Sequence, residues 1–133
     1  MRACFADTYY FLALSNARDE AHEQAVGLAG SLRRPLVTTT WVLTEVGDGL
    51  AETPGRTVFP EVLERLRGDP RTTVVETTDL LFEEGVTLYA GRPDKEWSLT
   101  DCISLVVMES NGLTDALTAD HHFEQAGFAI LMR

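Results

Sequence analysis

Four acidic residues lie at or just beyond the edge of an apolar segment: Asp7, Glu45, Asp101 and Asp120. Asp7 and Asp120 directly follow the two clearest candidates for buried strands, residues 3–6 and 116–119. In an open parallel sheet, ligands bind outside the carboxyl ends of the strands, so residues placed one step past a strand can meet there. The spacing therefore predicts one acidic pocket built from distant parts of the chain.

Carboxylates that gather in one pocket repel one another, so a fold that brings them together normally binds a divalent cation. Mg²⁺ or Mn²⁺ fits this set best, because every donor is a hard oxygen and no cysteine or histidine is placed to favour zinc. Such an ion activates water and stabilises an in-line displacement at a phosphorus centre. The four residues therefore predict hydrolysis of phosphodiester bonds.

Each carboxylate also has a purely structural interpretation. Asp7 could cap the helix that follows it, and Asp120 could form a turn or a cap. Asp101 lies three residues after Ser98, which is the spacing of a capping box. Glu45 is the hardest to explain in this way, because a carboxylate near a buried helix face is costly unless it is paired or lies on an exposed edge. The combination of all four carries the prediction.

The composition predicts a single globular domain over residues 1–133. The chain is 44% hydrophobic and 24% charged, and a chain of this length buries enough surface to form its own core. Its 21 acidic and 11 basic residues give a net charge of −10, which excludes a broad electrostatic surface for nucleic acid. A nucleic-acid substrate would need cations as intermediaries or a local arginine patch.

The two cysteines indicate a reducing compartment. Cys4 and Cys102 fall inside apolar segments and form no CxxC or Cys/His spacing, as expected of small buried thiols. The chain has no basic start followed by an apolar run and no run of about 18 consecutive apolar residues. We therefore expect a cytoplasmic protein with no membrane segment.

Hydrophobic patterning predicts strands that alternate with helices. Strands are expected at residues 2–6, 36–39, 72–75, 116–119 and 128–131. Helices are expected at residues 9–14, 20–32, 41–50, 59–66, 80–91, 98–108 and 121–126, and a Thr-Pro-Gly break at residues 53–55. Because parallel neighbours need crossover connections, this order predicts a three-layer α/β/α sandwich around a mostly parallel sheet of about five strands.

The same residues, with their neighbours, resemble the PIN domain. Asp7-Thr8 follows the first strand, Glu45 lies in the helix after the second, and Ser98-Leu99-Thr100-Asp101 opens an apolar helix. The most specific part is the closing pattern Leu117-Thr118-Ala119-Asp120-x-x-Phe123, with Gly127-Phe128 after it. The resemblance covers essentially the whole chain, which within this family is most similar to the VapC-type toxins of prokaryotic toxin–antitoxin pairs.

This resemblance implies a Mg²⁺- or Mn²⁺-dependent endoribonuclease. The four acidic residues would be both its catalytic groups and its metal ligands, and Thr8 and Thr118 would be supporting hydroxyls. The resemblance further implies an RNA substrate, a homodimer, and a small VapB-like antitoxin that wraps the toxin and blocks the acidic pocket.

The histidines and a pair of arginines are weaker candidates. His121 and His122 adjoin Asp120, but adjacent helical residues point in different directions, so at most one can face the pocket and surface placement is expected. His22 is expected on a solvent-exposed helix face. Arg33-Arg34 could contact RNA phosphates, although cations near a helix end also interact favourably with the helix dipole.

Two other functions remain open. A response-regulator receiver also gathers carboxylates and magnesium at strand ends, but it uses a lysine near the phosphoryl group, and the only lysine here is Lys95, in the loop before Asp101. A PIN-like domain that processes RNA without being a toxin, or that only binds partners, would have the same sequence signals.

Overall fold

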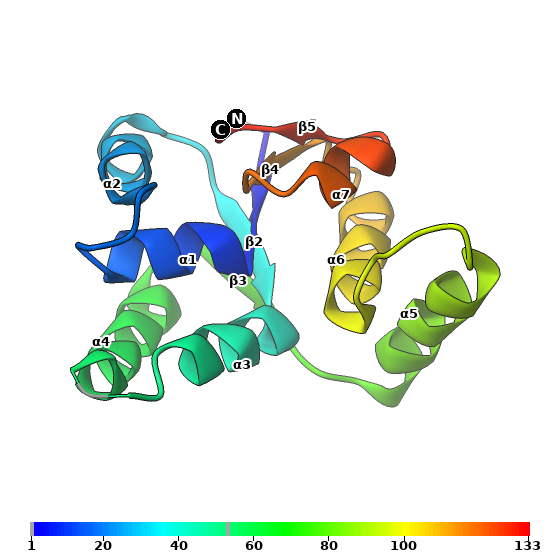
Figure 1. The fold of residues 1–133 in the computed structure, drawn as a ribbon, viewed down its shortest axis with the longest axis horizontal. Coiled ribbons are helices and arrows are strands. Elements are labelled where there is room, and N and C mark those ends of the chain that lie inside the picture. Colours follow the sequence, from blue (N-terminus) through cyan, green and yellow to red (C-terminus); the bar gives the residue numbers. More distant parts are fainter. Residues whose placement is uncertain (1, 53) are drawn as a thin grey trace.

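The computed structural model describes residues 2–52 and 54–133, and in them five strands form one parallel sheet (Figure 1). The strands are β1 (Cys4–Ala6), β2 (Leu36–Thr39), β3 (Thr72–Val75), β4 (Asp115–Leu117) and β5 (Ala129–Ile130). Their order in the sheet is β3-β2-β1-β4-β5, and each neighbouring pair is parallel. The predicted parallel sheet of about five strands is confirmed.

Helices cover both faces of this sheet. They are α1 (Thr8–Ser15), α2 (His22–Ser31), α3 (Thr40–Gly49), α4 (Gly55–Gly68), α5 (Asp79–Gly91), α6 (Leu99–Ser110) and α7 (His121–Gln125). The first four lie on one face, whereas α6 and α7 lie on the other and α5 packs against α6 (Figure 1). The predicted three-layer fold is confirmed. Among the described residues, none of the helices has the length and hydropathy needed to cross a membrane.

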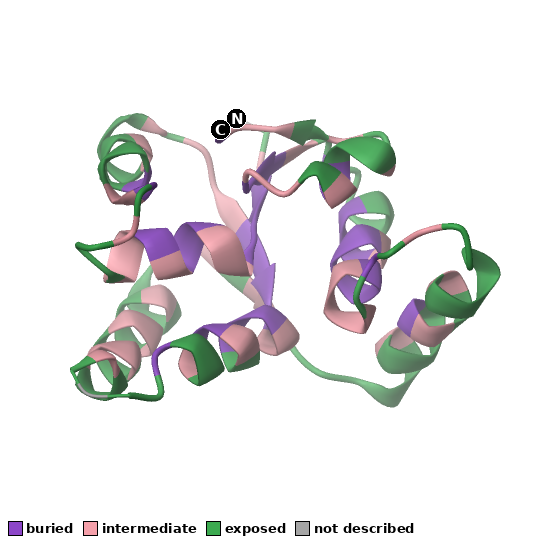
Figure 2. Cartoon of the chain, in the orientation of Figure 1, coloured by how far each residue is buried: buried purple, intermediate pink, exposed green. Residues whose placement is uncertain are grey.

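The centre of the sheet is the most deeply buried part of the molecule (Figure 2). All three residues of β1 are buried, as expected for a central parallel strand covered on both faces. Phe5 in β1 lies 6.3 Å from Phe123 of α7 between ring centroids. The Thr38 hydroxyl donates a hydrogen bond to the Ala6 carbonyl at 2.8 Å. These contacts fix the end of β1, from which the candidate site begins.

The two cysteines are free and buried, as predicted. Burial is the main cause that raises the pKa of both the Cys4 and the Cys102 thiol above its ordinary value. A thiol that stays protonated is a poor nucleophile and a poor metal ligand. Both cysteines therefore act as small core residues.

Strand β4 is shorter than the predicted strand at residues 116–119, since it ends at Leu117. The Thr118 hydroxyl accepts a hydrogen bond from the backbone N–H of Asp120 at 3.1 Å, which turns the chain away from the sheet. Leaving the strand here brings Thr118 and Asp120 to the same edge of the sheet.

Helix α4 is longer than the predicted helix at residues 59–66, because it begins at Gly55. Its first turn contains the polar residues Arg56 and Thr57, which interrupt the apolar spacing that the sequence prediction relies on. Of the break predicted at residues 53–55, Thr53 lies outside the described residues.

Replacing Gly85 by alanine is expected to destabilise the protein by about 1–3 kcal/mol, the usual cost of overpacking a close contact. Gly85 is the buried residue of α5, and a methyl group there would overlap the Cγ1 atom of Ile103 on α6. Urea denaturation of wild-type and Gly85→Ala protein measures the effect.

Gly91→Ala is the matched control, because this glycine is also in α5 but an added Cβ there meets no described atom within 4 Å. Its free energy of unfolding is expected to equal or slightly exceed that of the wild type. Equal stability of the two variants would show that α5 and α6 do not depend on close approach at Gly85.

Candidate active site

The candidate site lies where β1 and β4 run side by side at the carboxyl edge of the sheet. The chain leaves β1 toward β2 on one side and reaches β4 on the other, so this edge is a topological switch point, where open parallel sheets bind ligands. An open pocket of about 490 Å³ lies here. Its lining includes all four of the predicted acidic residues, Asp7, Glu45, Asp101 and Asp120.

Asp7 is the most deeply buried of the four, with 6% of its surface exposed. It occupies the N-cap position of α1, but its side chain makes no capping hydrogen bond, so the capping interpretation does not account for it. Its Oδ2 atom instead accepts a hydrogen bond from the Thr118 hydroxyl at 2.9 Å. Burial raises the pKa of Asp7 to about 7, opposed by this hydrogen bond and reinforced by the charges of Asp101 and Asp120.

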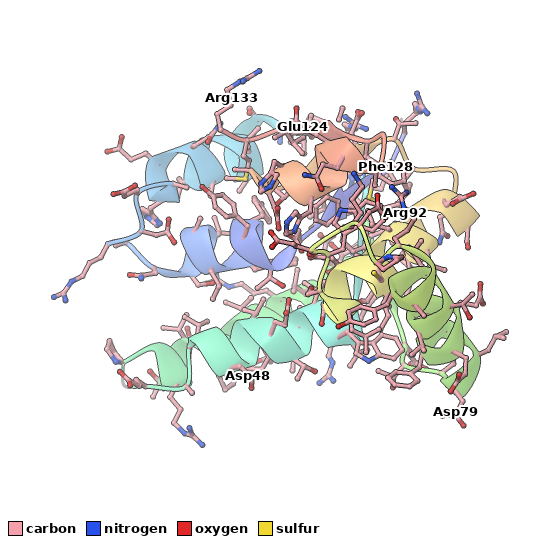
Figure 3. All side chains as sticks on the ribbon, turned by 45° about the vertical axis from the view of Figure 1, so that its right-hand side comes forward. Asp48, Asp79, Arg92, Glu124, Phe128 and Arg133 are labelled. Atoms are coloured by element: carbon pink, nitrogen blue, oxygen red, sulfur yellow. The ribbon has the colours of Figure 1, made fainter. Side chains whose placement is uncertain are left out.

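Glu45 reaches the pocket from α3, which begins where the Thr39 side chain accepts a hydrogen bond from the backbone N–H of Val42 at 3.0 Å. The Glu45 side chain is half buried, and its Oε1 atom accepts a hydrogen bond from the Thr8 hydroxyl at 2.6 Å. The structural interpretation of Glu45 as a carboxylate on an exposed helix edge therefore does not apply to it. Asp48 on the same helix does occupy such an exposed position, on the outer side of α3 (Figure 3).

Asp101 is both a capping residue and a pocket residue. Its backbone N–H donates to Ser98 Oγ at 3.0 Å and its Oδ2 atom accepts from the Ser98 backbone N–H at 3.2 Å, which completes the predicted capping box of α6. The same Oδ2 atom lies 3.1 Å from Nδ1 of His122. The capping role and a role in the pocket are therefore compatible.

Asp120 caps α7, because its Oδ1 atom accepts a hydrogen bond from the backbone N–H of His122 at 2.9 Å. Thr118 precedes it and connects two of the acids: its hydroxyl donates to Asp7 and accepts from the Asp120 backbone. The structure thus places Thr118 and Thr8 beside the carboxylates, where hydroxyl donors can hold them in position.

The lining of the pocket also includes Glu96 and His122, which the sequence analysis did not place there. The expectation of surface placement holds for His121, whose side chain is 70% exposed, but it is wrong for His122, at 19%. The only signal in the sequence was that His122 adjoins Asp120, which does not show which way the imidazole points. Glu96 belongs to the loop before α6 and had no pattern to reveal it.

The structure also places two weaker candidates, His22 and Arg34, away from the pocket. His22 is half buried rather than solvent exposed, since its Nδ1 atom lies 2.8 Å from the Ala13 carbonyl oxygen between α1 and α2. Arg34 pairs with Asp115 at 2.8 Å and precedes β2, so it lies at the amino edge of the sheet, opposite the pocket. A role for Arg34 in holding RNA phosphates at the acidic pocket does not fit this position.

The donor set of the pocket fits Mg²⁺ or Mn²⁺. Four carboxylates line this pocket, and among the described residues no arginine or lysine forms an ion pair with any of them. The buried Asp7 carboxylate has acidic neighbours whose charges raise its pKa. Uncompensated hard oxygen donors of this kind suit a divalent cation, which would relieve the repulsion.

Comparison with known proteins agrees with the fold. The PIN domain family matches residues 4–129, and the chain therefore belongs to this family. It is similar to the "23S rRNA-specific endonuclease VapC20" of Mycobacterium tuberculosis, strain H37Rv, with 34% identity over 125 residues that cover 93% of this chain and 94% of VapC20. The family resemblance seen in the sequence is confirmed, which decides against the receiver-like alternative.

Solved structures show the same fold. The crystal structure of VapC20 from Mycobacterium tuberculosis, described as a "Sarcin-Ricin loop cleaving toxin", matches with a TM-score of 0.88 and 27% identity over 98% of this chain and 99% of that one. FitAcB from Neisseria gonorrhoeae matches with a TM-score of 0.66 and 16% identity, over 96% of this chain and 95% of that one. A toxin–antitoxin complex from Klebsiella pneumoniae matches with a TM-score of 0.68 and 15% identity, over 97% of this chain and 96% of that one.

Proposed function

We propose that the protein is a metal-dependent endoribonuclease and the toxin of a toxin–antitoxin pair. The observation that carries this proposal is the convergence of four carboxylates from separate segments at the carboxyl edge of the sheet, with no arginine or lysine paired to them among the described residues. Its similarity to VapC20, whose name describes an endonuclease for 23S rRNA, supports RNA as the substrate.

Asp7, Glu45, Asp101 and Asp120 would hold one or more Mg²⁺ or Mn²⁺ ions. Bound there, the metal would supply an activated water and charge stabilisation at the scissile phosphate. The chain's own groups position the ligands: the Thr118 hydroxyl holds Asp7, and the Thr8 hydroxyl holds Glu45. Fixed donors of this kind reduce the rearrangement that metal binding requires.

The acidic surface determines how RNA can bind. With a net charge of −10, the chain repels a polyanion at long range, so the metal ions in the pocket must neutralise the phosphates next to the cleaved bond. We infer that a structured RNA, with bases splayed into the pocket, is the substrate class, since protein readout of RNA sequence mostly targets unpaired bases. The sarcin–ricin loop is the first RNA to test, because VapC20 is described as a toxin that cleaves it.

The proposed partners are a small antitoxin and a second copy of the chain. Among the fold neighbours is a toxin–antitoxin complex, which supports an antitoxin partner in the cytoplasm for this chain. Homodimerisation follows from the family resemblance. Light scattering of the purified protein tests it, because one chain has a mass of 14.7 kDa and a dimer twice that.

RNA cleavage by the purified protein is expected to require Mg²⁺ or Mn²⁺. Excess EDTA should reduce the rate to background, and an excess of either ion over the chelator should restore it, because the carboxylates alone supply no activated water. Gel analysis of an end-labelled RNA containing the sarcin–ricin loop measures this. Cleavage that persists in EDTA would point to a metal-independent ribonuclease and would refute the proposal.

A further inference from the structure

The acidic pocket has a second kind of donor, the imidazoles of His121 and His122. Nδ1 of His122 lies 3.1 Å from Asp101 Oδ2 and 3.4 Å from Asp120 Oδ1, and Nδ1 of His121 lies 3.8 Å from the same Asp120 oxygen. One ligand atom from each of Asp120, His121 and His122 lies within 4.8 Å of the other two. Two nitrogens and a carboxylate oxygen therefore converge at the rim of the pocket.

These separations match the geometry of a zinc site. Zinc bonds of about 2.0–2.2 Å to nitrogen and oxygen place neighbouring ligands of a tetrahedral ion about 3.3–3.6 Å apart. The distances to Asp120 Oδ1, 3.4 Å from His122 Nδ1 and 3.8 Å from His121 Nδ1, lie within and just above that range. The donors of Asp120, His121 and His122 are therefore close enough together to share one ion.

The local fold holds these donors together. Asp120 is the N-cap of α7, and His121 and His122 are the first two residues of that helix, so all three lie in a single turn. The two imidazole rings are 4.6 Å apart between centroids and tilted by 52°. His122 is the inner, largely buried donor, and His121 is the outer one, open to the solvent from which an ion arrives.

We propose that Asp120, His121 and His122 form a Zn²⁺ site, in which water completes the coordination of the ion. Imidazole nitrogen is a preferred ligand of Zn²⁺, whereas Mg²⁺ takes oxygen ligands. Asp120 also belongs to the proposed hydrolytic site, so Zn²⁺ bound here withdraws one of its four carboxylates and inhibits RNA cleavage. The inhibition rests on the proposed function, but the binding of Zn²⁺ does not.

The sequence analysis placed no histidine to favour zinc, whereas this proposal uses two. The competing explanation is structural: His122 would only hold Asp101 and Asp120 by hydrogen bonds. That explanation gives no role to His121, because its ring is exposed and its contact with Asp120 is longer. The His121→Ala variant therefore distinguishes the zinc site from the structural explanation. Because the His121 side chain is exposed, removing it does not disturb the core.

Titration calorimetry of metal-free protein with Zn²⁺ is the direct test. The wild type is expected to bind one Zn²⁺, His121→Ala to bind it at least about tenfold more weakly, and the double variant His121→Ala/His122→Ala at least about 100-fold more weakly, because each change removes a ligand. His22→Gln is the control, since the third histidine of the chain contacts Ala13 instead, and it should bind Zn²⁺ like the wild type.

Co²⁺ gives an independent readout, because a tetrahedral site with nitrogen ligands gives this ion much stronger visible absorption than an octahedral oxygen site. The wild type should show that absorption, and the double variant should lose it while keeping the circular dichroism of a folded protein. Equal Zn²⁺ affinity in the wild type and the double variant, or no binding by the wild type, would overturn the proposal.

The two proposals fail in different ways. If Zn²⁺ binds as expected but RNA is not cleaved in Mg²⁺, the endoribonuclease proposal is wrong and the zinc site stands. If RNA is cleaved but added Zn²⁺ binds with the same affinity after both histidines are removed, the zinc site is wrong and the endoribonuclease proposal stands.

Discussion

Asp7→Asn protein is expected to cleave RNA more than about 100-fold more slowly than the wild type at saturating Mg²⁺, because losing a ligand should cost more than losing a group that merely supports one. Asp7 is the innermost acid of the pocket, and Asn keeps its size and its ability to accept the Thr118 hydrogen bond. The substitution thus removes the negative charge and little else. Single-turnover cleavage of an end-labelled RNA measures the rate.

Asp48→Asn is the matched control for this substitution. It removes the same charge from an exposed position on α3 that lies outside the acidic pocket, so its cleavage rate should equal that of the wild type (Figure 3). A similar rate loss in both variants would indicate a general effect of charge. Full activity in Asp7→Asn protein would remove Asp7 from the catalytic set.

The same substitution is expected to stabilise the metal-free protein. Burial is the largest cause that raises the folded-state pKa of Asp7 from 3.8 to about 7, so the fold prefers the protonated form. Folding is therefore penalised by ionisation of Asp7 as the pH rises through this interval, and the penalty is complete above it. It amounts to about 4 kcal/mol at about pH 8 and about 2 kcal/mol at about pH 5. Asn is neutral and avoids it.

Urea denaturation in EDTA measures this effect. Asp7→Asn protein should exceed the wild type in free energy of unfolding by up to about 4 kcal/mol at about pH 8, with a smaller difference at about pH 5. Adding Mg²⁺ should stabilise the wild type by mass action and so reduce the difference in free energy of unfolding between the two proteins. Asp48→Asn should show neither the gain nor the pH dependence. An Asp7→Asn protein less stable than the wild type at the higher pH would contradict the raised pKa.

The positions of the strand ends could be predicted from sequence because parallel strands are short apolar runs with clear limits. Asp7 directly follows such a run, and β2 and β3 occupy the predicted residues. The edge where these strands end is common to all of them, so the gathering of the acids followed from topology. Their metal-binding role remains a proposal.

Side-chain orientation could not be predicted in the same way. His22 lies on a helix with many polar residues, yet a carbonyl of the neighbouring helix binds its ring, and no periodicity within α2 reveals that contact. The His122 side chain lies beside Asp101 and Asp120, and this position depends on where β4 ends and α7 begins. The sequence pattern placed the end of β4 two residues too late, at residue 119 instead of Leu117, so it did not show where the turn before α7 begins.

The hydrogen bond from Thr118 to Asp7 joins residues that are 111 positions apart in the chain. A chain that is still being synthesised acquires Thr118 and Asp120 long after Asp7. Until then the first carboxylate has neither its hydroxyl partner nor its last acidic neighbour. The complete pocket can therefore form only after synthesis has passed Asp120, and shorter nascent chains lack part of the acidic set.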